Sequence, residues 1–138
     1  MNNTSSEYIK HNRVRLKEGS QTKVTEIFTE FFENIKRTIK GLKGYAILEN
    51  IENDREIIVL TFWETREDME NYYSKDSKIL SDLVEKVKPM FEQMPERSDY
   101  KITLFEIDWF IELIYTINYL MSKFLQLLYI LNYHLHSL

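Results

Sequence analysis

The stretch Glu56–Glu64, EIIVLTFWE, has the strongest β-strand character in the chain. β-branched and aromatic residues fill both of its alternating faces, which is typical of a central strand covered on two sides. Trp63 stands near its end, and the segment that follows, Thr65-Arg66-Glu67-Asp68, has the form of a capping box that opens a helix. We therefore expect the indole of Trp63 at a strand-to-helix corner, where it forms one wall of a cavity.

A second strand is predicted over Tyr8–Lys17, and it places Asn12 on the same face as Val14 and Leu16. A buried amide usually satisfies a nearby backbone group. A polar side chain on an apolar face is also the informative exception, and it then points to a ligand. Both interpretations of Asn12 are open, and we treat it as a candidate site residue that looks into the cavity beside Trp63.

The remaining elements follow from apolar spacing and turn signals. Together with the two strands they give the order strand, helix, strand, strand, helix pair, strand. This order predicts an α+β fold, the ferredoxin-like β-α-β-β-α-β antiparallel sheet with helices on one face. Both faces of the central strand are apolar, so we expect a second subunit to pack sheet against sheet and form a homodimer. The predicted elements are a helix over 20–42, a strand over 45–50, helices over 65–73 and 77–91, and a strand over 100–107.

Length and composition limit the function. The chain has 138 residues, which suits one modest domain, and its formal net charge of −4 argues against a nucleic-acid partner. It contains no cysteine, which excludes disulfides, thiolate metal sites and a cysteine nucleophile. The polar N-terminus lacks the apolar core of a signal peptide, so we expect a cytoplasmic protein. We divide the chain into a disordered leader (1–7), a domain (8–107) and a hydrophobic helical extension (108–138).

Residues 8–107 resemble the antibiotic biosynthesis monooxygenase domain family, whose members form dimeric α/β barrels. The resemblance is carried by HNRVRLKEGS, LKGYAILEN, IIVLTFWETREDMENYY and the closing YKITLFEI, and WETREDMENY is its most specific part. The family implies a cavity between sheet and helices in each subunit. It includes cofactor-independent oxygenases of aromatic polyketides and haem-degrading monooxygenases.

In the haem-degrading branch three side chains matter, an Asn on the first strand, a Trp on the helix after the central strand, and an iron-ligating His on the next helix. Asn12 matches the first, and Tyr72 falls where that branch has its Trp. The predicted helix over 77–91 has no histidine, and Ser81 and Asp82 fall at the ligand position. Haem iron needs an axial donor such as His, Cys, Met or Tyr, so the resemblance to this branch is partial, and Tyr72 or Tyr73 would have to replace the histidine.

The chemistry left is that of a cofactor-independent monooxygenase acting on an aromatic or porphyrin-like substrate. Such an enzyme supplies an apolar pocket, hydrogen bonds to a developing oxyanion and exclusion of water. We predict that Asn12, Trp63 and Tyr72 line this pocket, with no required cofactor and no metal. The base is then the substrate, water or Asp82. Because Tyr72 and Tyr73 are adjacent on a helix, we expect at most one of them to face the pocket.

Alternatives stay open. Trp63 is also interpreted as a residue of the barrel core, because large aromatic side chains mostly fill cores. The whole domain can be a non-catalytic dimeric module that binds a small aromatic ligand, or a haem-binding or haem-degrading protein with atypical ligation. The extension over 108–138 predicts one long helix, apolar over most of its circumference. It packs on the dimer or closes the cavity, makes peripheral contact with a membrane, or promotes association. His134 and His136 alone are a weak metal signal.

Overall fold

The structure is a computed structural model that describes residues 7–106 and 109–137. The chain divides into two compact units, Met1–Thr103 and Leu104–Leu138. We describe each unit by itself. The predicted leader lies outside the described residues except for Glu7, whose backbone N–H donates to the carbonyl of Trp63 at 2.9 Å. The predicted boundary at 107–108 also lies outside them.

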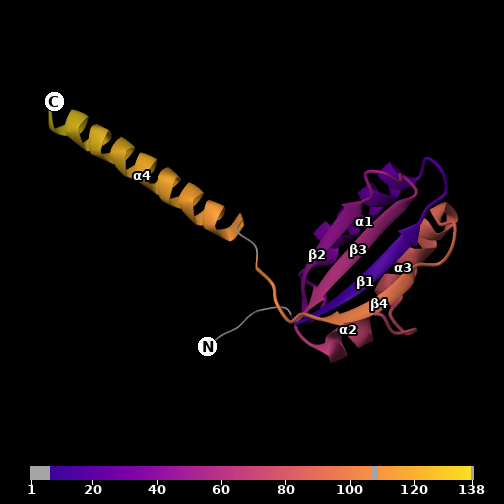
Figure 1. Cartoon of the computed structure of the whole chain (residues 1–138). Coiled ribbons are helices and arrows are strands. Elements are labelled where there is room, and N and C mark those ends of the chain that lie inside the picture. Colours follow the sequence, from indigo (N-terminus) through magenta and orange to yellow (C-terminus); the bar gives the residue numbers. More distant parts are fainter. Residues whose placement is uncertain (1–6, 107–108, 138) are drawn as a thin grey trace. The chain divides into compact units, whose positions relative to one another are not determined.

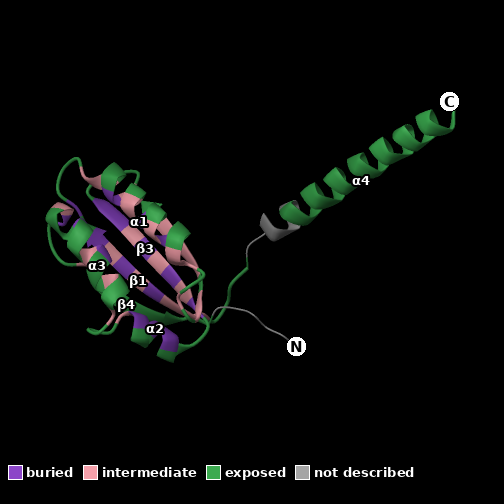
Figure 2. Cartoon of the chain, turned by 180° about the vertical axis from the view of Figure 1, so that it is seen from behind, coloured by how far each residue is buried: buried purple, intermediate pink, exposed green. Residues whose placement is uncertain are grey.

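The first unit is a four-stranded antiparallel sheet with helices on one face, as Figures 1 and 2 show. The strand order β2-β3-β1-β4 puts the predicted central strand inside the sheet, between β2 and β1. The predicted ferredoxin-like α+β fold is therefore confirmed, whereas the predicted dimeric barrel stays a prediction. The elements are β1 (Tyr8–Arg15), α1 (Gln21–Ile35), β2 (Leu42–Glu49), β3 (Glu56–Trp63), α2 (Arg66–Tyr72), α3 (Lys78–Val87), a 3₁₀ turn (Lys88–Met90) and β4 (Glu96–Lys101).

Alternation along β3 decides which side chains the helices cover. Ile57, Val59, Thr61 and Trp63 are buried, while the residues between them are only half-buried. Figure 2 shows this alternation as purple and pink segments along β1 and β3. The register pairs Asn12 of β1 with Val59, which brings both side chains to the covered face. The core beneath α1 and α3 is built from Val14, Leu16, Val24, Phe28, Phe32, Ile57, Val59, Leu83, Val87 and Phe91.

The fourth strand was predicted in the wrong place. It runs over Glu96–Lys101 and not over 100–107. Its sequence, ERSDYK, is polar and its side chains are exposed, because β4 pairs only with β1 and forms an edge of the sheet. The apolar run that attracted the prediction follows the strand, and there Leu104 is 85% exposed. The prediction therefore followed apolar character into residues that lie beyond the strand.

The first helix is shorter than predicted. It ends at Ile35, where the Thr38 hydroxyl donates to the Ile35 carbonyl at 2.8 Å. The apolar residues beyond it, Ile39 and Leu42, pack instead against the cluster around Trp63. Gly41 has φ +78°, and a Cβ there would meet the side chain of Asp68, so a glycine is required where the chain turns into β2.

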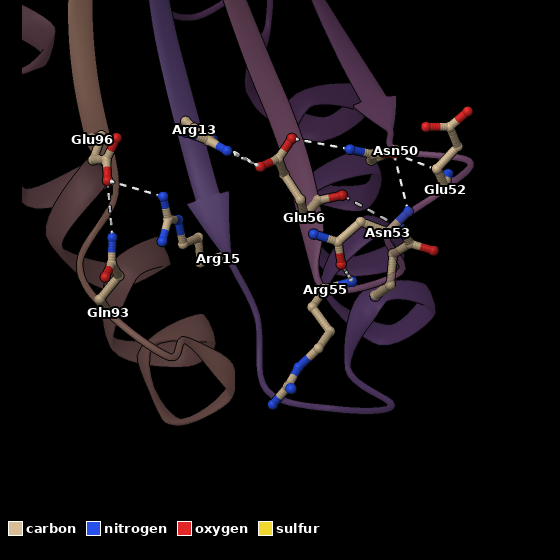
Figure 3. Close-up of polar contacts among 10 residues, drawn as sticks. Arg13, Arg15, Asn50, Glu52, Asn53, Arg55, Glu56, Gln93 and Glu96 are labelled. Carbon is tan, nitrogen blue, oxygen red and sulfur yellow. Dashed lines mark hydrogen bonds and ion pairs between the residues drawn. The ribbon is translucent and has the colours of Figure 1, made fainter.

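A polar network closes the end of the sheet where β3 begins, as Figure 3 shows. The guanidinium of Arg13 pairs with the carboxylate of Glu56 at 2.6 Å, and Asn50 donates to the same carboxylate at 3.2 Å. The Asn50 side-chain oxygen in turn accepts the backbone N–H groups of Glu52 and Asn53, which fixes the turn between β2 and β3. This network lies on the face of the sheet that the helices leave open.

The second unit contains one helix, α4 (Trp109–His136), of 28 residues. Its described side chains are exposed along its whole length. In the described part of the chain, no helix combines the length and the apolar character that crossing a membrane requires. The helix itself agrees with the prediction for this region.

Candidate functional site

A cavity lies between the covered face of the sheet and helices α1 and α3. Its volume is about 30 Å³, which is room for one or two water molecules. The lining is mostly apolar, as in small-molecule sites, but a ligand with an aromatic ring enters only if the lining side chains move apart. The lining residues are Asn12, Val14, Phe28, Phe32, Val59, Tyr72, Tyr73, Leu80, Leu83, Val84, Val87, Phe91, Pro95 and Arg97.

Four side chains form a hydrogen-bonded relay under this cavity. The indole N–H of Trp63 donates to the Thr61 hydroxyl oxygen at 2.8 Å, and that hydroxyl lies 2.9 Å from the hydroxyl of Tyr73. The amide nitrogen of Asn12 donates to the same Tyr73 oxygen at 3.2 Å. Asn12 and Trp63 are therefore connected, but through Thr61 and Tyr73 and not directly.

The hydrogen-bonding needs of Thr61 favour one direction for the hydrogen bonds of the relay. Thr61 is fully buried and already accepts the Trp63 N–H, so its single proton needs an acceptor. Among the described residues the Tyr73 oxygen is the acceptor that its hydroxyl reaches. Tyr73 then accepts from both Asn12 and Thr61, and its own proton is left for an acceptor in the cavity.

The amide of Asn12 has one orientation. Its nitrogen lies 3.0 Å from the carbonyl oxygen of Val59, which can only accept, so the N–H groups must face Val59 and Tyr73. Both donors of the amide are thus used within the protein. The Asn12 oxygen accepts no hydrogen bond from the described residues, and Asn12 lines the cavity. The side chain both satisfies a backbone group and presents an acceptor to a ligand.

Tyr72 contributes a free donor. Its ring is buried and packs against Trp63, with ring centroids 5.3 Å apart. Its hydroxyl has no hydrogen-bond partner among the described residues, although the side chain lines the cavity. Burial raises the pKa of the Tyr72 phenol well above its usual value, and the neighbouring Tyr73 adds to this. The phenol therefore stays protonated at neutral and mildly alkaline pH.

Tyr73 lies between two cations. The ammonium of Lys10 is 4.8 Å from the ring centroid, and the guanidinium carbon of Arg97 is 5.1 Å from it. Burial raises the pKa of the Tyr73 phenol, while the hydrogen bonds from Thr61 and Asn12 and the charge of Arg97 act in the opposite direction. Lys10 is neutralised by an ion pair with Asp99 at 2.5 Å. Arg97 makes no ion pair with the described residues, so its charge is available to a ligand at the cavity's edge.

These positions sharpen and partly overturn the site expected from the sequence. Asn12 and Tyr72 line the cavity as expected. Trp63 is fully buried in the cluster with Met69 and Tyr72, and it is not among the lining residues. The expectation that at most one of Tyr72 and Tyr73 faces the cavity is wrong, because both line it. Their rings meet edge to face, 4.8 Å apart.

Thr61 and Arg97 were missed, and Tyr73 was considered only as an alternative to Tyr72. Thr61 carried a readable signal, since it is a polar residue on the covered face of β3, two positions before Trp63. Tyr73 is the C-cap residue of α2, and this position, which ends the helix, turns its ring towards the sheet. Arg97 could not be found, because it fell in the segment interpreted as a loop. It lies in β4, opposite Asn12.

Two other candidates lie elsewhere. Asp82 is exposed on α3 and lines a separate hollow with Glu30 and Lys86, so it is not a base for the cavity. His11 is on the open face of the sheet, where its ring meets Tyr100 edge to face. Within the described ranges no group of three or more His, Cys, Asp or Glu side chains could hold a metal ion.

Comparison with known proteins gives one family match for the sequence. The model of the antibiotic biosynthesis monooxygenase family matches residues 7–77, more than half of the chain. A search of curated proteins finds no match.

Solved structures share the fold at low sequence identity. A Nitrosomonas europaea protein described as a candidate antibiotic biosynthesis monooxygenase has a TM-score of 0.62 and 14% identity, over 75% of this chain and 96% of its own. A Chloroflexus aurantiacus protein described in the same way has a TM-score of 0.58 and 16% identity, over 74% of this chain and 98% of its own. SnoaB, a cofactor-independent oxygenase from Streptomyces nogalater, was solved as a variant and has a TM-score of 0.60 and 11% identity, over 73% and 97%.

Proposed function

Because the chain belongs to the antibiotic biosynthesis monooxygenase family, we propose that it is a small cofactor-independent monooxygenase whose cavity widens to admit an aromatic substrate beside Tyr72 and Asn12. The observation that carries the proposal is the pair of phenol hydroxyl groups, of Tyr72 and Tyr73, that line an apolar cavity. SnoaB, which shares the fold, is a cofactor-independent oxygenase and supports the absence of a required cofactor.

The reaction needs an acidic C–H bond on an electron-rich ring system. Loss of that proton gives a carbanion, which transfers electrons to O₂ and forms a C–O bond at the same carbon. The resulting hydroperoxide loses water and leaves a carbonyl. A CH₂ group and O₂ thus become a C=O group and H₂O, and the substrate supplies all four electrons. The protein has to stabilise the negative charge on the substrate oxygen and exclude bulk water.

The cavity has the groups for this task. Tyr72 and Tyr73 can donate to an oxyanion of the substrate, and their raised pKa values keep them protonated while they do so. The Asn12 oxygen can accept from a phenolic hydroxyl. Arg97 adds a positive charge at the edge of the cavity, which favours the ionised substrate.

The cavity offers no strong base. Its described lining contains neither a carboxylate nor a histidine. We therefore assign the acidity to the substrate, whose own pKa Arg97 and the two phenols lower on binding. The rate of oxygen uptake is then expected to rise with pH until the substrate is ionised, with no loss below the high pKa of Tyr72.

The same lining does not fit a haem iron. Tyr72 and Tyr73 are the axial donors that it offers, and ligation through oxygen would require the phenolate. The pKa of each phenol is raised, which opposes that form. The Tyr73 oxygen also receives hydrogen bonds inside the relay. We therefore assign no step to haem.

We also propose that the open face of the sheet pairs with a second copy, so that the enzyme is a homodimer. Ile58, Leu60 and Phe62 of β3 lie half-buried on this face, and the neighbouring Leu48 is 46% exposed. An apolar sheet face of this kind is typically packed against another sheet.

Oxygen consumption with an anthrone, a tricyclic ketone with an acidic CH₂ group, tests the function. The wild-type chain is expected to accelerate O₂ uptake and formation of the quinone. Tyr72→Phe is expected to lower kcat by about 10²–10³, the usual cost of losing one oxyanion donor. Tyr100→Phe, the same change on the open face, should leave the rate unchanged. Equal rates for the wild-type chain, Tyr72→Phe and buffer across a panel of polycyclic phenols would leave the domain a binding module.

A further inference from the structure

Helix α4 carries an apolar stripe with a seven-residue period. Side chains alternate at steps of four and three residues from Leu113 to Leu131, and a parallel row follows every seventh residue from Ile114 to Leu135. In heptad terms these are the a, d and e positions, which fall together on one side of a helix. The stripe comprises Leu113, Ile114, Ile117, Leu120, Met121, Phe124, Leu127, Leu128, Leu131 and Leu135.

The opposite side of α4 is different in kind. It is mostly polar or tyrosine-rich, and it is interrupted by two apolar residues, Leu125 and Ile130. Its other members are Tyr115, Thr116, Asn118, Tyr119, Ser122, Lys123, Gln126, Tyr129, Asn132, Tyr133 and His136. Neighbours on the two sides are equally accessible within the chain, since Leu120 is 59% exposed and Tyr119 is 62% exposed. The helix therefore has one face that requires cover and one that suits solvent.

The period of the stripe selects the kind of partner. A straight helix has 3.6 residues per turn, so a strict seven-residue repeat drifts by about 20° per heptad unless the helix supercoils around another helix. The stripe keeps its repeat over almost the whole of α4. A helix that covered a sheet or a globular surface would have no reason to keep this period. The pattern therefore indicates another long helix.

The absence of charged side chains from the stripe is compatible with pairing between two copies of the same helix. Every side chain of the stripe is uncharged, so two copies can meet face to face without placing like charges together. A helix that lies on a membrane surface usually has a strongly charged polar face rich in Lys and Arg. Among the described side chains of α4, Lys123 is the one lysine and there is no arginine. Attraction to anionic lipid is therefore weak, and the polar face does not compete with self-pairing.

The extent of the stripe fits such a pairing. Its ten side chains are 43–71% exposed, and they extend over a helix of 28 residues. At 1.5 Å per residue the helix is about 42 Å long, which exceeds what one side of a domain of this size spans. A second α4 matches this length and can cover the whole stripe.

We infer that α4 is a self-association element, in which the stripe of one chain packs against the stripe of a second copy in a helical bundle. This inference does not depend on the oxygenase reaction or on pairing through the sheet. It assigns the residues beyond the family domain to assembly.

Sedimentation velocity of the full chain across a dilution series tests the inference. Leu120→Glu places a charge in the centre of the stripe and is expected to raise the dissociation constant of self-association at least tenfold. Tyr119→Glu, the adjacent residue with the same exposure, is the matched control and is expected to change it less than twofold. Leu127→Glu repeats the test one heptad further along the helix.

Association through the sheet must not hide the effect. Leu120→Glu and Tyr119→Glu are therefore also made in a Leu48→Glu background, because Leu48 lies on the open sheet face. Equal dissociation constants for Leu120→Glu and Tyr119→Glu in both backgrounds would overturn the inference, and so would a monomeric full chain. Binding of a monomeric chain to phosphatidylcholine vesicles, abolished by Leu120→Glu, would assign the stripe to lipid instead.

Discussion

The sheet carries two polar networks, and they differ in charge, burial and partners. The relay of Trp63, Thr61, Tyr73 and Asn12 is neutral and lies on the helix-covered face. The network around Glu56 is charged and lies on the open face, where Arg13 keeps 42% of its side chain exposed. Both networks connect β1 to β3, but the first lies under a cavity, and the second lies at the end of the sheet, where Arg13 is partly exposed.

The difference shows what a fold of this size can do with polar side chains. A buried polar side chain is best tolerated when it is neutral and hydrogen-bonded, because an ion without close partners is costly there. A solvated network can use charges, but screening makes each of its bonds weak. The buried relay is therefore suited to holding protons in fixed positions for chemistry, and the exposed network is suited to fixing the register of the strands.

The largest change in the free energy of unfolding is expected from Thr61→Val. This substitution keeps the volume but removes the hydroxyl that accepts the Trp63 N–H inside the core. The expected loss of unfolding free energy is about 1–3 kcal/mol. Chemical denaturation measures it, and Thr103→Val at an exposed position is the control, expected to change stability by less than about 0.5 kcal/mol.

A double-mutant cycle then isolates the hydrogen bond. In the Trp63→Phe background the N–H is absent, so Thr61→Val should cost clearly less than in the wild-type chain. An equal cost in both backgrounds would mean that the hydroxyl stabilises the fold by some other contact. It would also remove the physical basis for the direction assigned to the relay.

The next prediction compares an Asn→Ala substitution in each of the two networks. Asn12→Ala removes hydrogen bonds to Val59 and Tyr73, but the cavity lets water replace part of the amide, so the expected loss is about 0.5–1.5 kcal/mol. Asn50→Ala removes an acceptor of two turn N–H groups that solvent also reaches, and about 0.5 kcal/mol is expected.

Asn12→Ala and Asn50→Ala are expected to differ more in their rates of oxygen uptake than in their free energies of unfolding. Asn12→Ala is expected to lower oxygen uptake with the anthrone by roughly tenfold, because Tyr73 loses a donor and the substrate an acceptor. Asn50→Ala should retain the wild-type rate at temperatures where it is folded. A similar loss in both variants would show that the assay responds to stability and not to the cavity.

The two networks also show which parts of the structure could be predicted from the sequence. The apolar run of β3 and the apolar spacing in α1 were sufficient to predict the central strand and its covering helix, and alternation in β1 predicted the side of Asn12. The same reasoning placed the last strand on apolar residues, whereas an exposed edge strand is held by backbone pairing and can be polar, as Glu96–Lys101 is. Because this strand was predicted at the wrong residues, Arg97, the positive charge at the edge of the cavity, was not identified as a site residue.

Side-chain direction at a helix end was the other limit. Adjacent helical residues diverge, which argued that Tyr72 and Tyr73 could not share the cavity. Tyr73, however, is a C-cap with φ −89° and ψ 5°, outside the regular helix. That turn brings its hydroxyl to Thr61. Local periodicity cannot report such a geometry, because it depends on where the helix stops.

The smallest effect concerns acid stability. The hydrogen bond from Arg13, aided by Asn50, lowers the pKa of the Glu56 carboxyl below its usual value. A carboxyl with a lowered folded pKa adds stability above its unfolded pKa, near 4.3, and that stability is lost as the pH falls through the lowered value. Arg13→Gln should therefore flatten the decline of unfolding free energy between about pH 5 and the acid limit.

The magnitude is small because the pair is partly solvated. Less than about 1 kcal/mol is expected between Arg13→Gln and the wild-type chain at neutral pH, and less still in 1 M salt. The relay should not respond to this range at all, since the pKa of its one phenol, Tyr73, is raised above its usual value. Urea unfolding at pH 7 and pH 4, with Thr61→Val beside Arg13→Gln, tests both halves of the argument. A pH-dependent difference for Thr61→Val would show that a titrating group couples to the cavity.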